Sequence, residues 1–199
     1  PFLAKDCVNY IGEPILLVVG PDRAALNKIL RQIEVEYEQR PPILTLEEAM
    51  ARASDFICGD KPWFAAYEYE KGDADAAIRR AVDSIEEDFY TGYQEQAYLE
   101  PQGMFAECGG GGVTVRGSMQ CPYYVKRALS QALGWEGARI RVIQLPTGGG
   151  FGGKEEYPSI PAVHAALAAV KTGRPVQFVF DRGEDILCTT KRHPSVIRM

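Results

Sequence analysis

The sequence predicts a mixed α+β fold organised in two units, and three observations carry this prediction. Apolar residues recur at helical spacing in some segments and alternate with polar residues in others. Between them, residues 53–62 lack periodicity and contain Gly59, Asp60 and Pro62, so we place a boundary between unit 1–62 and unit 63–199. With 199 residues, of which 46% are hydrophobic and 25% charged, the chain has enough apolar side chains for a globular core.

The first unit alternates short strands and helices. Residues 7–11 and 14–19 are rich in strand-forming residues, and Gly12-Glu13 between them predicts a hairpin. Asp22 is a candidate N-cap for a helix through about residue 33, and alternation over 33–37 predicts a strand with one wet face. Thr45 and Glu48 have the capping-box spacing, which predicts a short helix.

The second unit has longer elements. We expect strands over 64–70 and 85–93 on either side of a helix that Asp73 caps, and a hairpin over 104–116 that turns at 109–112. A helix from Pro122 should end at Gly134, and a helix over 161–172 at Gly173. Strands are expected from residue 140, over 176–180 and at 195–199, and because the last one stops at the chain end we expect a fragment.

Composition argues against several classes of function. A net charge of −5 without a cluster of Lys and Arg does not favour nucleic acid or an anionic membrane as a partner. The five cysteines are odd in number and contain no CxxC pair, which indicates reduced thiols in a cytoplasmic protein. The longest apolar run, residues 162–170, is far shorter than the ~20 residues of a membrane span.

The stretch GGGFGGK, residues 148–154, is the strongest motif in the chain. It fits GxGxxG of dinucleotide-binding folds, but an acid is missing about 20 residues later and Phe151 occupies the loop interior. It also fits most of a P-loop, but Glu155 stands where Ser or Thr should bind magnesium. A glycine-rich turn without a ligand is a further alternative. So many glycines lose much conformational entropy on folding, which argues against that alternative and favours close approach of the backbone to a bulky anionic or metal-bearing cofactor.

Together with Glu100-Pro101 and Gln120, this stretch resembles the molybdenum-binding subunit of the xanthine dehydrogenase and aldehyde oxidase family. The resemblance implies that Phe151 and Gly152 lie beside the metal centre and that the Gly152 N–H donates to an oxygen of the molybdenum. It likewise implies that Gln120 contacts the apical oxygen. The implied cofactor-binding residues are Gln120, Gly150, Phe151, Gly152 and Gly153, with no direct metal ligand.

Other positions bear on specificity. Glu155 matches the step at which xanthine-using members of the family carry Glu, so it is a candidate for binding a purine, although an acid near a helix N-terminus is also favourable by itself. Gln96 stands where many members have His, which leaves fine specificity open. We expect structural roles for His164 and for His193, which has no second His or Cys nearby.

The resemblance covers nearly the whole chain. It implies a hammerhead-like α/β domain at 1–62 followed by the first part of a molybdopterin-binding domain at 63–199. It further implies a cytoplasmic enzyme with molybdenum–molybdopterin, either as such or in a dinucleotide form. Such an enzyme hydroxylates a purine-like heterocycle or an aldehyde and passes electrons to iron–sulfur clusters and FAD on partner subunits or domains.

Catalysis is not assigned to any residue of this chain. The family's base is a glutamate near the C-terminus of the large subunit, and no segment here matches it, so we expect the 199 residues alone to be inactive. Two alternatives from other classes stay open at this stage. One is a nucleotide-binding α/β enzyme that uses the same glycines, and the other is a non-catalytic binding or assembly module.

Overall fold

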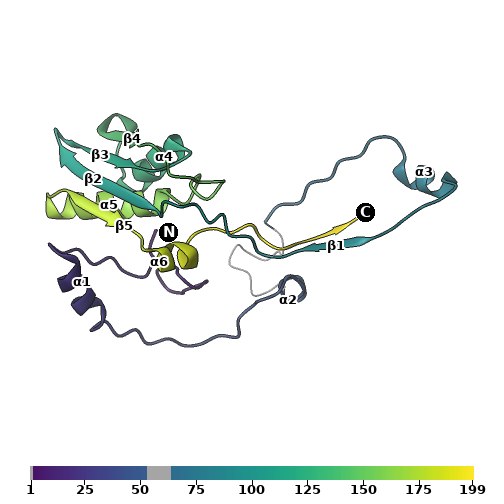
Figure 1. The fold of residues 1–199 in the computed structure, drawn as a ribbon, viewed down its shortest axis with the longest axis horizontal. Helices are drawn as coiled ribbons and strands as arrows, with labels where there is room; N and C mark the ends of the chain where they lie inside the picture. Colours follow the sequence, from purple (N-terminus) through teal and green to yellow (C-terminus); the bar gives the residue numbers. More distant parts are fainter. Residues whose placement is uncertain (1, 53–63) are drawn as a thin grey trace. The chain divides into compact units, whose positions relative to one another are not determined.

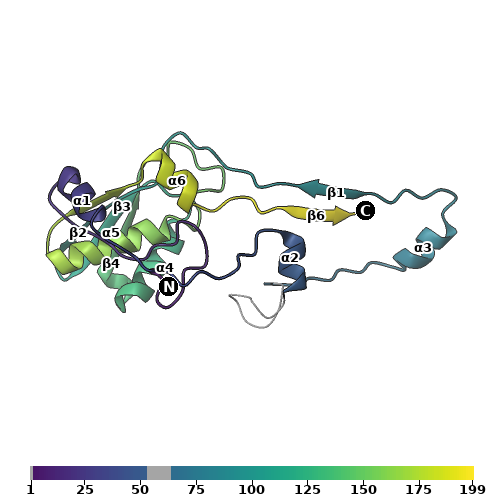
Figure 2. The ribbon, with the colours of Figure 1, turned by 90° about the horizontal axis from the view of Figure 1, so that it is seen from below.

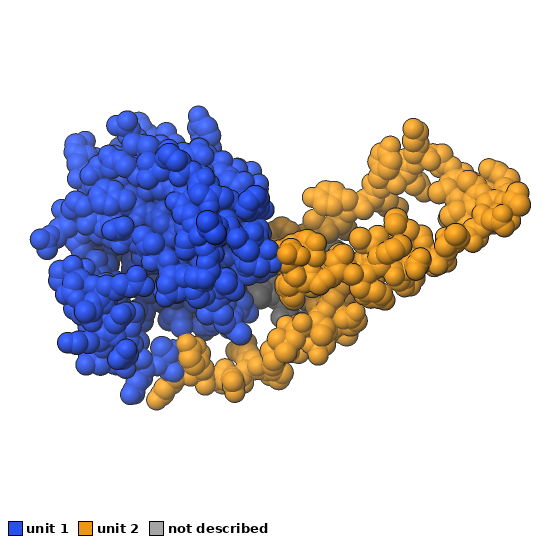
Figure 3. Space-filling model, in the orientation of Figure 1, with its two compact units in different colours: residues 1–35, 95–191 blue, residues 36–94, 192–199 orange. Residues whose placement is uncertain are grey.

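The computed structural model describes residues 2–52 and 64–199. They form two compact units built from interleaved segments, coloured separately in Figure 3. Unit 1 comprises residues 1–35 and 95–191, and unit 2 comprises residues 36–94 and 192–199. Each unit is described by itself below.

Unit 1 is built on a four-stranded sheet with the order β4-β3-β2-β5. Strands β2 (Gly103–Gly109) and β3 (Gly112–Gly117) form an antiparallel hairpin, and β5 (Val176–Val179) pairs with β2 in antiparallel register. Strand β4 (Ile140–Gln144) runs parallel to β3, which requires a crossover helix between them. The hairpin turn is made by Gly110 and Gly111, whose positive φ values of 58° and 79° suit a tight two-residue turn.

Two helices cover one face of this sheet, as Figures 1 and 2 illustrate. Helix α5 (Ser159–Thr172) packs on β2, β3 and β5, and helix α4 (Pro122–Leu133) packs beside α5 and on β4. A short 3-10 turn, η2 (Gly137–Arg139), leads from α4 into β4. Both helices end at a left-handed glycine, Gly134 and Gly173, as the sequence predicts.

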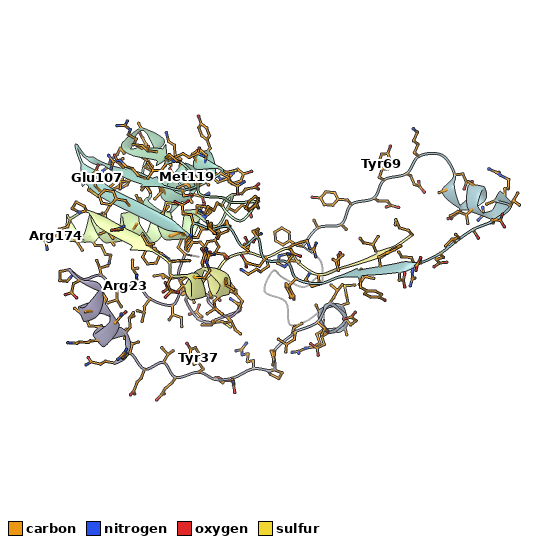
Figure 4. The ribbon with its side chains drawn as sticks, in the orientation of Figure 1. Arg23, Tyr37, Tyr69, Glu107, Met119 and Arg174 are labelled. Carbon is orange, nitrogen blue, oxygen red and sulfur yellow. The ribbon has the colours of Figure 1, made fainter. Side chains whose placement is uncertain are left out.

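The core lies between the sheet and these helices because alternate strand residues point toward them. Its buried members include Met104, Ala106, Val113, Val115, Met119, Leu129 and Val163. Met119, labelled in Figure 4, follows β3 and is completely buried, so the backbone just after this strand is fixed by the core. On the other face of the sheet, Arg116 of β3 forms an ion pair with Glu107 of β2, and Glu107 is labelled in Figure 4.

Two further helices and a buried histidine complete unit 1. Helix α1 (Arg23–Leu30) is capped by Asp22, and α6 (Arg182–Cys188) has a full capping box from Asp181 and Glu184. His164 on α5 is buried, contacts the Phe2 carbonyl oxygen through Nε2 at 2.7 Å, and meets the Phe178 ring edge-on. The structural role expected for this histidine is therefore confirmed.

The described residues of unit 2 have little regular structure. It contains helices α2 (Leu46–Ala51) and α3 (Ala74–Arg80), with the predicted capping box of Thr45 and Glu48 and the predicted Asp73 cap. Strands β1 (Asp88–Thr91) and β6 (Ser195–Arg198) pair as an antiparallel ribbon. Many of its apolar side chains are exposed, among them Tyr69, which is labelled in Figure 4 and is 87% accessible.

Several predicted strands are absent from the described residues. Residues 7–11, 14–19, 33–37 and 64–70 form no strand, and the strand expected over 85–93 is reduced to β1. The reason is that alternation selects which face a strand would bury, whereas the strand itself needs a partner edge for its hydrogen bonds. In this structure Tyr37 and Tyr67 on those segments are 60% and 96% exposed.

The overall class agrees with the sequence. The fold is mixed α and β, as predicted, with the hairpin and the helices α4 and α5 at the expected places. The predicted boundary between residues 62 and 63 falls at the end of the stretch 53–63, outside the described residues, and stays a prediction. Within the part of the chain that the structure describes, no helix is long and apolar enough to cross a bilayer.

Candidate functional site

All four strands of the unit 1 sheet deliver residues of the candidate site to one edge. The parallel strands β3 and β4 both end there, so Gln120 and the glycine loop 148–154 follow strand ends that lie side by side. Strand β2 begins at this edge and β5 ends at it, which adds Glu100 and Asp185. The carboxyl ends of parallel strands are where ligands bind in open α/β sheets.

Three loop residues adopt left-handed backbone conformations. Gly149 and Gly152 have φ values of 95° and 90°, a region that other residues rarely adopt. Phe151 between them has a φ of 50° although it is not a glycine, and its side chain is 78% exposed. Because a left-handed non-glycine residue costs about 1–3 kcal/mol, an exposed aromatic ring held in this way points to a role other than packing.

The other three glycines of the loop are needed for close approach. A Cβ on any of them would overlap a neighbouring side chain. The overlaps are Gly148 with Glu100, Gly150 with the carboxamide of Gln120, and Gly153 with the ring of Tyr98. The loop is therefore pressed against side chains at three points, and the high glycine content has a physical explanation at each position.

Gln120 holds the second half of the loop. Its Oε1 accepts hydrogen bonds from the backbone N–H groups of Gly152 and Lys154, both at 3.1 Å. The backbone N–H of Gln120 donates to the Lys154 carbonyl oxygen at 2.6 Å. Two N–H donors on one atom identify that atom as the oxygen of the carboxamide. The Nε2 group makes no hydrogen bond with any described residue, and the side chain is exposed, so its two donors face outward.

This geometry differs from the arrangement that the resemblance implies for Gly152. Its N–H is taken up by Gln120, so it has a partner within the loop, whereas Gln120 Nε2 has none among the described residues. The sequence-derived set is otherwise brought together, since Gln120, Gly150, Gly152 and Gly153 are all in direct contact or one residue apart.

Glu100 holds the first half of the loop. Its Oε2 accepts the Gly148 N–H at 2.7 Å and the Nζ of Lys154 at 2.9 Å, and its N–H donates to the Gly148 carbonyl oxygen. Burial raises the pKa of Glu100, but the bonds from Lys154, from Gly148 and from Ser118 outweigh it and hold the pKa below its usual value. The carboxylate is therefore charged at neutral pH.

A buried polar network supports the loop from beneath. The Tyr98 hydroxyl donates to Asp185 Oδ1 at 2.6 Å, and Gln102 Nε2 donates to both the Tyr98 hydroxyl and the Gly153 carbonyl oxygen. Burial, and then the bond to Asp185, raise the pKa of Tyr98, so it stays protonated. Arg182 closes the network by donating to the Tyr98 carbonyl oxygen at 2.7 Å.

Sequence reasoning did not assign roles to Tyr98, Gln102, Lys154 and Asp185. Their signal is weak, because Gln, Lys and Asp are mostly exposed, Tyr is only intermediate in burial, and nothing in their spacing marks them as buried. Glu155, the candidate for substrate recognition, is exposed and forms no hydrogen bond or ion pair with the described residues. No group of three or more His, Cys, Asp or Glu able to hold a metal ion occurs among residues 2–52 and 64–199.

Comparison with known proteins agrees with this geometry. A model of the molybdopterin cofactor-binding domain matches residues 59–199. The chain belongs to this family. A xanthine dehydrogenase of Blastobotrys adeninivorans is 36% identical over 200 residues, which cover 100% of this chain and 14% of that protein. The nicotinate dehydrogenase large molybdopterin subunit of Eubacterium barkeri is 33% identical, over 98% of this chain and 45% of that subunit.

Solved structures have the same fold. The aldehyde oxidoreductase from Desulfovibrio desulfuricans superposes with a TM-score of 0.82 at 22% identity, over 100% of this chain and 22% of that one. The CO dehydrogenase from Oligotropha carboxidovorans gives 0.73 at 26% identity, over 86% and 23%. The chain thus spans less than half the length of the relatives named here.

The nucleotide-binding alternative is not favoured. A P-loop lysine reaches out to phosphate, but the Lys154 side chain has 0% exposure and is turned inward onto Glu100. The helix after the loop begins at Ser159, so its N-terminus does not directly follow the glycines as both nucleotide motifs require.

Proposed function

We propose that this chain is the part of a molybdenum hydroxylase that contacts the molybdenum–molybdopterin cofactor through Gln120 and the glycine loop. The observation that carries the proposal is the Gln120 carboxamide, whose oxygen is occupied by two loop N–H groups so that its Nε2 donors face outward. Membership of the family and the relatives' names support the cofactor type.

The residues present fit such a group. Anionic oxygen atoms need hydrogen-bond donors that are fixed before binding, and Gln120 Nε2 is such a donor. Addition of a Cβ to Gly150 would occupy the position of the Gln120 carboxamide, so the cradle depends on a glycine there. The exposed ring of Phe151, in the same loop, offers an apolar surface to a ligand.

When bound, the cofactor supplies the oxidative hydroxylation of an electron-poor carbon. The chain's own contribution would be to bind and orient it. Gln120 would donate hydrogen bonds, and Gly150 and Gly153 let the loop lie against Gln120 and Tyr98. The Phe151 ring would cover one side of the group. Gly152 belongs to the same site through its N–H bond to Gln120. No catalytic base is assigned to this chain, and the isolated 199 residues should be inactive.

The substrate we propose is a purine-like heterocycle or an aldehyde. Glu155 supports the heterocycle, because it is exposed one residue after the loop and has no partner among the described residues. A carboxyl group there is suited to sharing a proton with a ring nitrogen. Electrons should pass to iron–sulfur clusters and FAD on partner subunits or domains, and the name of the Eubacterium barkeri relative, a large molybdopterin subunit, supports an enzyme of several subunits. The protein should be cytoplasmic.

The division into a hammerhead-like domain at 1–62 and a molybdopterin-binding domain at 63–199 belongs to the same proposal. The start of the family match at residue 59 supports it.

The test is the metal content of the complete gene product purified from its own host. We expect elemental analysis to find stoichiometric molybdenum in the wild type and a strong loss in Gly150→Val, whose side chain would displace the Gln120 carboxamide. Gly109→Ala is the control, because a Cβ there meets nothing within 4 Å. A clean wild-type preparation without molybdenum, or NAD binding that Gly150→Val abolishes, would refute the proposal.

A further inference from the structure

Lys154 is the most unusual charged residue of unit 1, because its side chain is completely buried. Its Nζ lies 2.9 Å from Glu100 Oε2, 3.0 Å from Ser118 Oγ and 4.8 Å from the centre of the Tyr98 ring. Removing an ammonium group from water is costly, and a well-packed apolar side chain of similar volume is often at least as stable. A reason beyond stability is therefore needed for a lysine at this position.

The hydrogen bonds around Lys154 form a closed circuit. Glu100 is bonded to Gly148 through both its backbone N–H and its carboxylate, which fixes the start of the loop. Gln120 is bonded to Lys154 through both its backbone N–H and its side-chain oxygen, which fixes the end of the loop. The side chain of Lys154 then joins the two halves, since its Nζ donates to the same Glu100 oxygen that holds Gly148.

The circuit has a consequence for Gln120. Its carboxamide would be free to rotate if the N–H groups of Gly152 and Lys154 moved away from Oε1. With them in place, the oxygen side faces the loop and the Nε2 donors face outward. The direction of these donors thus depends on the position of the Lys154 backbone, and that position depends on where the buried ammonium is anchored.

We propose that Lys154 and Glu100 are positioning residues, which fix the glycine loop so that the Gln120 carboxamide presents its Nε2 donors to the cofactor. The proposal rests on the proposed function of the loop in molybdenum cofactor binding. In it, the ion pair of Lys154 and Glu100 does not touch the cofactor but holds Gln120, the residue that does. Loss of such support commonly weakens retention of a metal group by about 10- to 100-fold.

The experiment uses the complete gene product loaded with cofactor, and measures the rate at which molybdenum is released into a chelating buffer. Lys154→Met keeps the length of the side chain and removes its charge. Glu100→Asp keeps the charge, so that the buried lysine retains a partner, but shortens the side chain so that one carboxylate cannot span Gly148 and Lys154. We expect each variant to release molybdenum about 10- to 100-fold faster than the wild type.

A matched control comes from the other face of the sheet. Glu107 forms an ion pair with Arg116, and its side chain is 40% exposed against 44% for Glu100. Glu107→Asp therefore makes the same chemical change at a similarly exposed carboxylate that does not touch the loop. We expect it to leave the release rate unchanged.

Combination with Gln120→Ala separates positioning from general destabilisation. If Lys154 acts through Gln120, then Lys154→Met has little further effect on release once Gln120 is Ala, because the group it positions is absent. Equal effects in both backgrounds would overturn the inference. Should Lys154→Met not fold, Glu100→Asp with and without Gln120→Ala gives the same decision.

The two levels of the proposal fail in different ways. A wild-type protein without molybdenum overturns the proposed function, and with it the inference. A wild-type protein that holds molybdenum, with release rates of Lys154→Met and Glu100→Asp equal to its own, overturns the inference alone.

Discussion

The ion pair between Glu100 and Lys154 should be strongly asymmetric in its contribution to stability. Its two members differ in burial, since the Lys154 side chain is completely buried and that of Glu100 is 44% exposed. Glu100→Ala leaves an ammonium group inside the protein with Ser118 as its remaining hydrogen-bond partner. Lys154→Met leaves a carboxylate that water can reach.

The burial values give the expected magnitudes. An uncompensated buried charge costs about 3–5 kcal/mol, so Glu100→Ala should lower the free energy of unfolding by about this amount. Lys154→Met loses two hydrogen bonds, and the exposed Glu100 is rehydrated while the methionine packs, so we expect a cost of about 1 kcal/mol. The double variant should be more stable than Glu100→Ala by about 2 kcal/mol or more, because it removes the unpaired charge.

Native-state hydrogen exchange of β2 and β3 is a suitable measurement, because it reports local unfolding of unit 1 within a complete protein. The pair of Arg116 and Glu107 serves as the control. Both side chains are partly exposed, at 34% and 40%, so truncation of either should cost at most about 1 kcal/mol. Equal losses for Glu100→Ala and Lys154→Met, or a double variant less stable than both, would refute the reasoning.

Three further predictions concern other residues of unit 1. Burial lowers the pKa of His164 from 6.5, although the hydrogen bond to the Phe2 carbonyl oxygen opposes this shift. The unfolded chain therefore binds the proton more readily than the folded protein. The free energy of unfolding should keep its full value above pH 6.5 and decrease below it. Urea unfolding should give a lower free energy of unfolding at pH 5 than at pH 7 in the wild type and in the His193→Gln control, and a smaller difference in His164→Gln. The same difference in all three proteins would contradict the prediction. Phe151→Gly should change the free energy of unfolding by less than about 1 kcal/mol, because it removes an exposed ring and relieves the strain of a left-handed non-glycine residue. The same variant should contain less molybdenum than the wild type. A large change in melting temperature with full molybdenum content would contradict this prediction. Gly117→Ala should destabilise by about 1–3 kcal/mol, because its Cβ would lie 2.5 Å from the Gly103 carbonyl oxygen, whereas Gly109→Ala should be tolerated; thermal unfolding of both compares them directly.

Much of the fold could be predicted where the signal is local. Asp22, Thr45 and Asp73 cap the helices that their positions predict, and the glycines after α4 and α5 end those helices. These signals depend on the chemistry of one turn of chain, which the sequence contains in full. The predictions of strands over 33–37 and 64–70 are wrong, because a strand needs the edge of a partner strand, which the alternation of residues does not specify.

The candidate site divides in the same way. The glycines could be singled out from the sequence because their motif is short and chemically distinctive, whereas Gln120 could be singled out only through the family resemblance. The role of Lys154 could not be predicted from the sequence, because a lysine after a glycine loop is equally consistent with binding a phosphate. Its burial on Glu100 joins residues that lie 54 positions apart in the chain, and the bond from the Gly152 N–H to Gln120 joins residues 32 positions apart.

By itself, the sequence determined the mixed α+β class, the helix ends and the set of residues that resemble a molybdenum site. The tertiary structure decided which way those residues face. Four strand ends at one edge of the sheet bring Glu100, Gln120, the glycine loop and Asp185 together, and the direction of each polar group is then set by the nearest available partner. Hydrogen-bond partners of this kind lie far apart in the chain, so no local pattern of residues encodes them.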